Sequence, residues 1–222
     1  MIKKKNFFLL IFFFISLTTY NLDEQKQSLS IFFPIKNIVI KNTFAIDLIK
    51  LKGELEFLKG SSLFFLKEEK IIDVTTKYDF ISSIQLKKTY PNTLKVLISE
   101  YRPVVTEINE KKRYYMTKKG KKINFVKRKI FENLPVIFGN HKNFSSLFEV
   151  LEKSNFNIKK IKAFYYFDVG RWDIELKDKK IIKLPVVNYE KVLMEIGSVL
   201  NDSNFIKYQI FDYRIKDQLI LQ

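Results

Sequence analysis

The feature that most constrains this chain is an apolar run close to its N-terminus. Residues 7–17 read FFLLIFFFISL and follow three lysines, Lys3, Lys4 and Lys5. Each Phe, Leu or Ile at a helix centre favours membrane insertion by roughly 0.3–0.6 kcal/mol, so about ten of them supply about 3–6 kcal/mol. We therefore expect the rest of the chain to be delivered across a membrane, with the basic N-terminus left in the cytoplasm.

Two fates are open for this run: cleavage as part of a signal peptide, or retention as an anchor. Its length suits a signal-peptide core and is below the roughly 20 residues of a comfortable span. However, Leu17-Thr18-Thr19-Tyr20 is a poor small-x-small cleavage site, and its tyrosine suits a membrane interface. We expect retention, with residues 1–5 as a cytoplasmic tail, 6–22 as a single transmembrane helix and 23–33 as a linker.

The composition of the chain bounds the class of the remainder. The sequence is 46% hydrophobic and 15% aromatic, which is enough to build packed cores, and it contains no cysteine for a disulfide or a thiolate metal site. The net charge of +16 would suit nucleic acid, but the lysines are spread over the whole length. We expect no nucleic-acid partner, and either a solvated lysine-rich surface or attraction to an anionic membrane.

The first part of the folded chain, residues 34–104, predicts a compact α+β unit. A strand at 35–40 precedes a helix at 47–59, whose leucines recur at helical spacing and which Gly60 closes. A second helix at 67–78 is expected to turn Ile71, Ile72 and Val74 inward. Alternating strands at 80–89 and 94–99 then flank the turn Tyr90-Pro91-Asn92-Thr93, which indicates a hairpin.

The second part, residues 105–222, is mainly β. We expect two helices, one begun by Asn143 with Phe144, Leu147, Phe148 and Leu151 inward, and one at 189–200. Aromatic residues alternate on both faces of the segment 164–167, which predicts a strand buried on both sides. The expected strands are 104–108, 113–116, 122–126, 134–139, 158–167, 171–176, 180–184, 206–212 and 218–222.

An enzyme needs convergent catalytic groups, and this sequence offers few. His141 is the only histidine, in an expected loop, and the six glycines match neither G-x-G-x-x-G nor G-x-x-x-x-G-K. Asp173 and Glu175 share one face of a strand, as a glycoside-cleaving pair would require, but we interpret them as the wet side of a half-buried strand. We predict no catalytic residue, no cofactor and no metal.

Four motifs follow one another along the chain. They are Tyr90-Pro91-Asn92-Thr93-Leu94-Lys95-Val96 with Ser99-Glu100-Tyr101-Arg102-Pro103-Val104, then Leu134-Pro135-Val136-Ile137-Phe138-Gly139, then Arg171-Trp172-Asp173-Ile174-Glu175-Leu176 with Ile181-Ile182-Lys183-Leu184, and last Phe211-Asp212-Tyr213-Arg214. Taken in this order, they resemble the motifs of the FtsQ/DivIB family of bacterial cell-division proteins. The segment from Met116 to Gly120 departs from the family's V-D-x-x-G turn, and Asn42 stands where a glycine usually ends the first strand.

The resemblance implies a single-pass protein of the bacterial inner membrane, with its N-terminus in the cytoplasm and its bulk in the periplasm at the division septum. It implies a POTRA (polypeptide-transport-associated) domain of order β-α-α-β-β at 34–104, followed by a mainly antiparallel β domain with two helices at 105–222. It also implies a non-enzymatic scaffold of the divisome, which binds FtsB-like and FtsL-like partners and links them to septal wall synthesis.

Strand addition is the route to partner binding that this sequence suits. A terminal strand at Asp217 to Leu221 would leave one row of backbone groups unpaired for a partner segment. Arg214 could donate two parallel hydrogen bonds to a partner carboxylate, or it could form an internal ion pair. Leu219 and Leu221 could contact the partner or could instead belong to the core. The expected contacts are Tyr213, Arg214, Ile215, Leu219 and Leu221, with Lys87, Lys88 and Lys95 of the first hairpin as a second surface.

Two other functions remain open at this point. A POTRA-containing protein-assembly or secretion factor would normally carry a long β-barrel, and the strands here are too few. A membrane-anchored wall enzyme would require His141, Asp173 or Glu175 to converge in a cleft.

Overall fold

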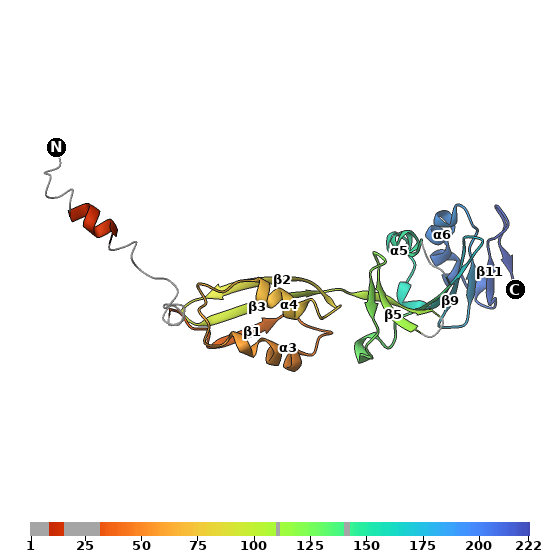
Figure 1. Cartoon of the computed structure of the whole chain (residues 1–222). Coiled ribbons are helices and arrows are strands. Elements are labelled where there is room, and N and C mark those ends of the chain that lie inside the picture. Colours follow the sequence, from red (N-terminus) through yellow and green to blue (C-terminus); the bar gives the residue numbers. More distant parts are fainter. Residues whose placement is uncertain (1–8, 16–31, 110–111, 140–142) are drawn as a thin grey trace. The chain divides into compact units, whose positions relative to one another are not determined.

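The computed structural model describes residues 9–15, 32–109, 112–139 and 143–222, and it divides into two compact units, Met1–Glu100 and Tyr101–Gln222. Figure 1 shows the helices and strands of each unit. Strand β4 (Pro103–Asn109) pairs within the second unit, so the domain boundary expected after Val104 falls inside this strand.

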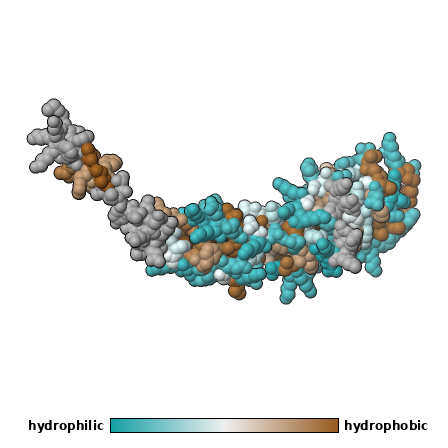
Figure 2. Space-filling view, viewed as in Figure 1, coloured by the Kyte–Doolittle hydropathy of each residue, from teal (hydrophilic) through white to brown (hydrophobic). Residues whose placement is uncertain are grey.

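Residues 9–15 form a helix of apolar side chains, all of them exposed and brown in Figure 2. Among the described residues, no helix has the length and apolar character needed to cross a membrane. The rest of the expected span, 6–8 and 16–22, lies outside the described residues.

The sheet of the first domain has three strands, β1 (Asn37–Lys41), β2 (Ile81–Thr89) and β3 (Thr93–Glu100). Their order is β1-β3-β2, with β1 parallel and β2 antiparallel to β3. Side chains alternate along the central strand, so that Leu94, Val96 and Ile98 are buried on one face. The expected hairpin is confirmed, with its turn between Thr89 and Thr93.

Two helices cover the buried face of this sheet. Helix α3 (Leu48–Leu55) continues into the 3₁₀ turn η1 (Glu56–Leu58), and the Asp47 carboxylate caps its start by accepting the N–H groups of Ile49 and Lys50. Leu51, Leu55 and Leu58 are buried at the expected helical spacing, whereas Leu48, the first residue of α3 and part of the same expected series, is exposed. The second helix, α4 (Glu69–Thr75), completes the expected β-α-α-β-β order.

Helix α4 corrects one expectation about which side chains are buried. Ile71 is buried and Val74 is half-buried, but Ile72 is exposed. The other buried position is Thr75, one turn after Ile71, because residues four apart share a helix face. The Thr75 hydroxyl donates to the Ile71 carbonyl at 2.8 Å, so its burial leaves the polar group paired.

The last residue of β3 closes the first domain. The Glu100 carboxylate accepts backbone N–H groups from Phe44, Ala45 and Ile46 at 3.1, 2.7 and 3.4 Å. This contact fixes the loop between β1 and α3, and Asn42 in that loop has a positive φ of 67°, as expected for a glycine substitute.

The second domain is built on a nine-stranded mixed sheet. Its order is β12-β11-β10-β9-β8-β7-β4-β5-β6, and the neighbours are antiparallel except for β4–β7, β7–β8 and β10–β11. The mainly antiparallel sheet expected from the sequence is therefore confirmed. The strands besides β4 are β5 (Lys112–Thr117), β6 (Lys122–Asn124), β7 (Val136–Phe138), β8 (Ile161–Phe167), β9 (Arg171–Leu176), β10 (Ile181–Lys183), β11 (Ile210–Asp212) and β12 (Ile220–Leu221).

Two α-helices lie on the same side of this sheet in Figure 1, α5 (Phe144–Lys153) and α6 (Tyr189–Asn201). The four apolar residues expected to face inward from α5 are all buried. The Phe144 ring packs edge-on against Phe164 of β8, with centroids 5.6 Å apart, and also contacts Trp172 of β9. Three short 3₁₀ turns, η2 (Lys129–Phe131), η3 (Ile158–Lys160) and η4 (Ser203–Phe205), complete the domain.

The aromatic strand β8 buries its aromatic rings fully on one face only. Phe164 is fully buried against the helices, whereas Tyr165 is half-buried and Phe167 is exposed on the opposite face. The expectation of a strand buried on both sides was wrong, because α5 and α6 cover one face of the sheet and leave these side chains on the other.

Candidate partner-binding edge

The sheet face opposite α5 and α6 carries a row of charged side chains near the C-terminal edge. The register places Asp173 of β9 opposite Lys183 of β10, and Lys183 opposite Asp212 of β11. Their strand neighbours point the other way, into the core. This row therefore brings together residues from three strands on the face that the helices leave open.

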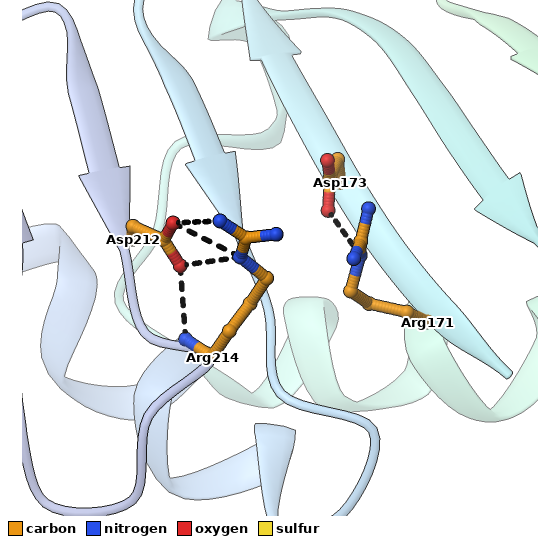
Figure 3. A network of polar contacts seen from close by, with 4 residues as sticks. All are labelled: Arg171, Asp173, Asp212 and Arg214. Carbon is orange, nitrogen blue, oxygen red and sulfur yellow. Dashed lines mark hydrogen bonds and ion pairs between the residues drawn. The ribbon is translucent and has the colours of Figure 1, made fainter. Parts of the chain in front are cut away.

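The Asp212 carboxylate is held by Arg214, which lies just beyond the end of β11. Arg214 donates Nε to Oδ1 and Oδ2 at 2.9 Å each, Nη2 to Oδ2 at 2.6 Å, and its backbone N–H to Oδ1 at 3.0 Å (Figure 3). These hydrogen bonds lower the pKa of Asp212 below its ordinary value, against the opposing effect of burial. The aspartate side chain is 7% exposed and the arginine 45%, so the guanidinium remains within reach of a partner.

A second ion pair lies on β9, two strands away. Arg171 donates Nε to Asp173 Oδ1 at 3.1 Å, and its guanidinium carbon lies 4.3 Å from the centroid of the Phe167 ring. Asp173 is buried, so its interpretation as the wet side of the strand was wrong. Loss of hydration raises the pKa of the Asp173 carboxyl, although Arg171, Lys183 and Arg214 act in the opposite direction.

Glu175, the other carboxylate on this face of β9, has separate partners. It accepts Lys162 Nζ and the Tyr165 hydroxyl, both at 2.7 Å, and the Lys162 hydrogen bond is the largest of the effects that lower its pKa. Asp173 and Glu175 are thus each engaged by a different basic residue. Over the described ranges no three acidic or histidine side chains are grouped as metal ligands, and His141 lies outside those ranges.

Within the part of the chain that the structure describes, the sheet ends at β12, which pairs with β11 and with no second strand. Ile210 and Gln222 exchange two hydrogen bonds, Ile210 N to Gln222 O at 3.0 Å and Gln222 N to Ile210 O at 3.1 Å. Backbone groups of successive residues in a strand point to opposite sides. The N–H and C=O of the preceding residue, Leu221, are therefore directed away from β11, toward the open edge.

The terminal strand is shorter than expected. Asp217 has a positive φ of 57° and Gln218 N–H bonds back to the Ile215 carbonyl at 3.2 Å, so this part of the expected strand is a turn. Side chains of Leu219 and Leu221 pack against the core, while Ile215 and Ile220 are exposed. Leu219 and Leu221 thus fix β12 against the core. Ile215 and Ile220 are left as exposed apolar side chains that a partner could contact.

Tyr213 lies between the charged row and the core. Its ring is half-buried against the core cluster, and its hydroxyl has no hydrogen-bond partner among the described residues. Burial raises the pKa of Tyr213 to about 12, with a smaller contribution from the Glu195 carboxylate.

The three lysines of the expected second surface do not share one face of the β2–β3 hairpin. Lys87 and Lys95 are cross-strand partners on the face away from the helices. Lys88 is opposite the buried Leu94 and donates its ammonium to the Phe64 carbonyl at 3.1 Å.

Sequence reasoning missed Arg171, Lys183 and Ile220 as members of the edge. The period of two along β9 places Arg171 on the same face as Asp173, which is the signal that could have found it, whereas Lys183 joins that face only through the register of β10 against β9. Ile220 follows from the same alternation once Leu219 and Leu221 are assigned to the core.

These features define the class of the protein: a three-stranded domain with POTRA topology followed by a β domain with an open C-terminal edge. Residues 33–101 match the family model described as POTRA domain, FtsQ-type. The chain is 27% identical over 196 residues to Cell division protein FtsQ of Rickettsia typhi, a match that covers 86% of this chain and 73% of that protein. The proteins of the same name from Rickettsia prowazekii and Rickettsia conorii are each 26% identical, over 86% of this chain and 72% of theirs.

The chain thus carries a POTRA domain of the FtsQ type and is similar over most of its length to proteins named Cell division protein FtsQ.

Proposed function

We propose that this protein is a non-enzymatic scaffold of the divisome. Residues 6–22 anchor it in the bacterial inner membrane with the N-terminus in the cytoplasm, and both domains lie in the periplasm at the septum. It binds FtsB-like and FtsL-like partners there and connects them to septal wall synthesis. The observation that carries this proposal is the open edge at β12, beside a charged row on the uncovered face of the sheet.

Partner binding proceeds by addition of a strand to β12. The outward N–H and C=O of Leu221 supply main-chain hydrogen bonds, and the exposed Ile215, in the turn before β12, offers an apolar contact. Arg214 uses Nε and Nη2 for Asp212, and Nη1 carries two further donors for a partner carboxylate. Tyr213 and Leu219 contribute by fixing the position of this edge against the core.

The test separates the Leu221 backbone from its side chain. Leu221→Ala keeps the outward N–H and removes most of the side chain, whereas Leu221→Pro also removes the N–H. The measurement is the Kd of each full-length variant, held in detergent, for the extracytoplasmic segment of the FtsB-like partner. One lost hydrogen bond plus the clash of the proline ring should weaken binding by Leu221→Pro about tenfold relative to Leu221→Ala.

Equal affinities of the Leu221→Pro and Leu221→Ala variants would show that the partner does not pair with this edge. Circular dichroism of both variants checks that the fold is retained. Proline is tolerated at this position in the free protein because the missing N–H points away from β11.

The hairpin lysines form a second, weaker surface for an acidic partner segment. Lys87 and Lys95 act as a pair on the face away from the helices, and Lys88 belongs to the opposite face. Reversing the pair, Lys87→Glu with Lys95→Glu, should weaken recruitment of a divisome partner, while Lys88→Glu serves as the comparison from the other face. Co-purification of divisome proteins from cells measures the difference, and equal recovery from all three strains would exclude this surface.

A further inference from the structure

A cluster of aromatic side chains lies at the end of the first domain where the chain enters β1. Three segments meet there, because Leu63 N–H donates to the Phe33 carbonyl at 2.9 Å and Lys36 N–H donates to the Asn92 carbonyl at 2.9 Å. The start of β1 is thereby joined to the loop before α4 and to the β2–β3 turn. The cluster, here named the aromatic collar, consists of Phe32, Phe33, Phe64, Phe65 and Tyr90.

The collar is exposed even though four of its five rings form contacting pairs. Its five side chains are between 42% and 61% exposed. The Phe33 and Tyr90 rings meet edge to face with centroids 4.9 Å apart, and those of Phe64 and Phe65 do so at 5.0 Å. Single exposed apolar residues are ordinary, but a cluster of large ones marks a surface that contacts something other than water.

The positive charge in the segments that form the collar favours contact with an anionic surface. Segments 32–36, 62–67 and 87–92 contain four lysines and no aspartate or glutamate. One of these lysines, Lys88, is tied directly to the collar by its hydrogen bond to the Phe64 carbonyl. Aromatic rings surrounded by lysines are typical of protein surfaces at the boundary between water and an anionic membrane, where Phe and Tyr enter the headgroup layer and lysines pair with phosphates.

The position of the collar in the sequence places a bilayer within its reach. The expected anchor ends at residue 22, and Phe32 follows ten residues later. Ten residues span at most about 35 Å when fully extended, so the collar cannot move further than that from the anchor's end. A tether of this length gives a high effective concentration, and a weak affinity for lipid then suffices for contact.

We propose that the aromatic collar rests in the headgroup layer of the anionic bilayer that holds the anchor. This contact would fix the tilt of the first domain on the membrane, in addition to the tether through the chain. The inference rests on the anchor of the proposed function, and it does not depend on partner binding at β12.

The absence of cysteine from the chain permits a direct test. The full-length protein is reconstituted into vesicles of phosphatidylcholine and phosphatidylglycerol, with a fluorescent NBD label at a single cysteine, Phe65→Cys or Phe32→Cys in the collar. The matched control is Ile49→Cys, on α3 of the same domain, where the side chain is 86% exposed. Quenching by nitroxide-labelled lipid reports contact with the bilayer, and quenching by iodide reports contact with water.

The collar labels should be quenched by nitroxide lipid at least about threefold more than the Ile49→Cys label, and less by iodide. Replacing phosphatidylglycerol by phosphatidylcholine, or adding salt, should reduce this difference because the lysines lose their anionic partners. The use of two collar sites preserves the test if one variant fails to fold.

Three outcomes would overturn the proposal. If both collar labels match the Ile49→Cys label, the collar is in water although the anchor holds. If the collar labels resist iodide and nitroxide lipid alike, the rings are covered by protein, such as a second copy of the chain. If the protein fails to float with the vesicles, the proposed anchor is refuted, and so is the proposed membrane contact of the collar. Partner affinity at β12 is measured separately, so failure of that proposal is distinguishable from each of these.

Discussion

Gly139 closes strand β7, and replacing it by alanine tests the packing at the centre of the second domain. Its φ is +93°, and a Cβ placed there would lie 2.2 Å from the Tyr166 carbonyl oxygen and 3.1 Å from the carbonyl carbon. The first distance is well below the 3.0 Å that Cβ atoms keep from other groups. Because the obstacle is backbone of the neighbouring strand β8, Gly139→Ala must displace one strand relative to the other.

Gly170→Ala is the matched control for this substitution. Gly170 has a similar φ of +85°, but its nearest contact would be an ordinary 3.6 Å, to Val186 Cγ1. A positive φ costs alanine about 1–2 kcal/mol, which the lower entropy of the unfolded chain offsets by about 0.4–1 kcal/mol. We therefore expect Gly170→Ala to lower the free energy of unfolding by about 1 kcal/mol. The strand displacement in Gly139→Ala adds about 1–3 kcal/mol.

The two variants can be compared by urea unfolding of the full chain in mild detergent. Trp172 is the only tryptophan and is buried in the second domain, so its fluorescence follows that domain. Gly139→Ala should unfold at clearly lower urea than Gly170→Ala, or about 10 °C lower on heating. Equal midpoints for the two variants would refute the inference that the approach of β8 requires glycine at the end of β7.

Three further predictions follow from the contacts described. Glu100→Gln should lower the free energy of unfolding of the first domain by about 1–3 kcal/mol, measured by circular dichroism, because an amide cannot accept all three N–H groups of the β1–α3 loop. Asp212 has a lowered pKa, so the stability that wild type gains over Asp212→Asn should shrink as the pH falls through and below 3.8. Asp173 has a raised pKa, so the stability that wild type loses relative to Asp173→Asn should be recovered as the pH falls toward 3.8. Opposite slopes in acid-unfolding curves check both. Tyr213→Phe should keep or raise the melting temperature, since it removes a buried hydroxyl without a partner among the described residues, and a large fall would show that the hydroxyl is bonded.

Local signals in the sequence predicted the first domain well. The Asp47 cap, the leucine spacing of α3 and the Pro-Asn turn between β2 and β3 are all short-range features, and each is decided by neighbours in the chain. Ile72 was assigned inward because three apolar residues occur together in α4, but a helix of seven residues has only two positions that face the sheet fully. A polar residue, Thr75, takes one of them because its hydroxyl bonds within the helix.

The sequence did not show which face of the second domain's sheet the helices leave uncovered. Aromatic residues alternate on both sides of β8, and nothing local shows which side the helices cover. The ion pair of Asp212 and Arg214 was within reach of the sequence, since it joins residues two apart, and an internal pair was one of the two roles considered for Arg214. The placement of Asp173 beside Lys183 depends on the register of β9 and β10, which only the folded sheet supplies.

The brevity of β12 has a consequence for how copies of this protein meet one another. An exposed sheet edge invites the same edge of a second molecule, and long flat edges aggregate in this way. Here only two residues are in strand conformation, and the turn around Asp217 bends the chain away from the sheet before them. Two such edges can exchange few hydrogen bonds, so like-with-like pairing gains little. A partner that brings a longer extended segment with its own side-chain contacts gains more, so the short edge favours pairing with such a partner over pairing between two copies of this chain.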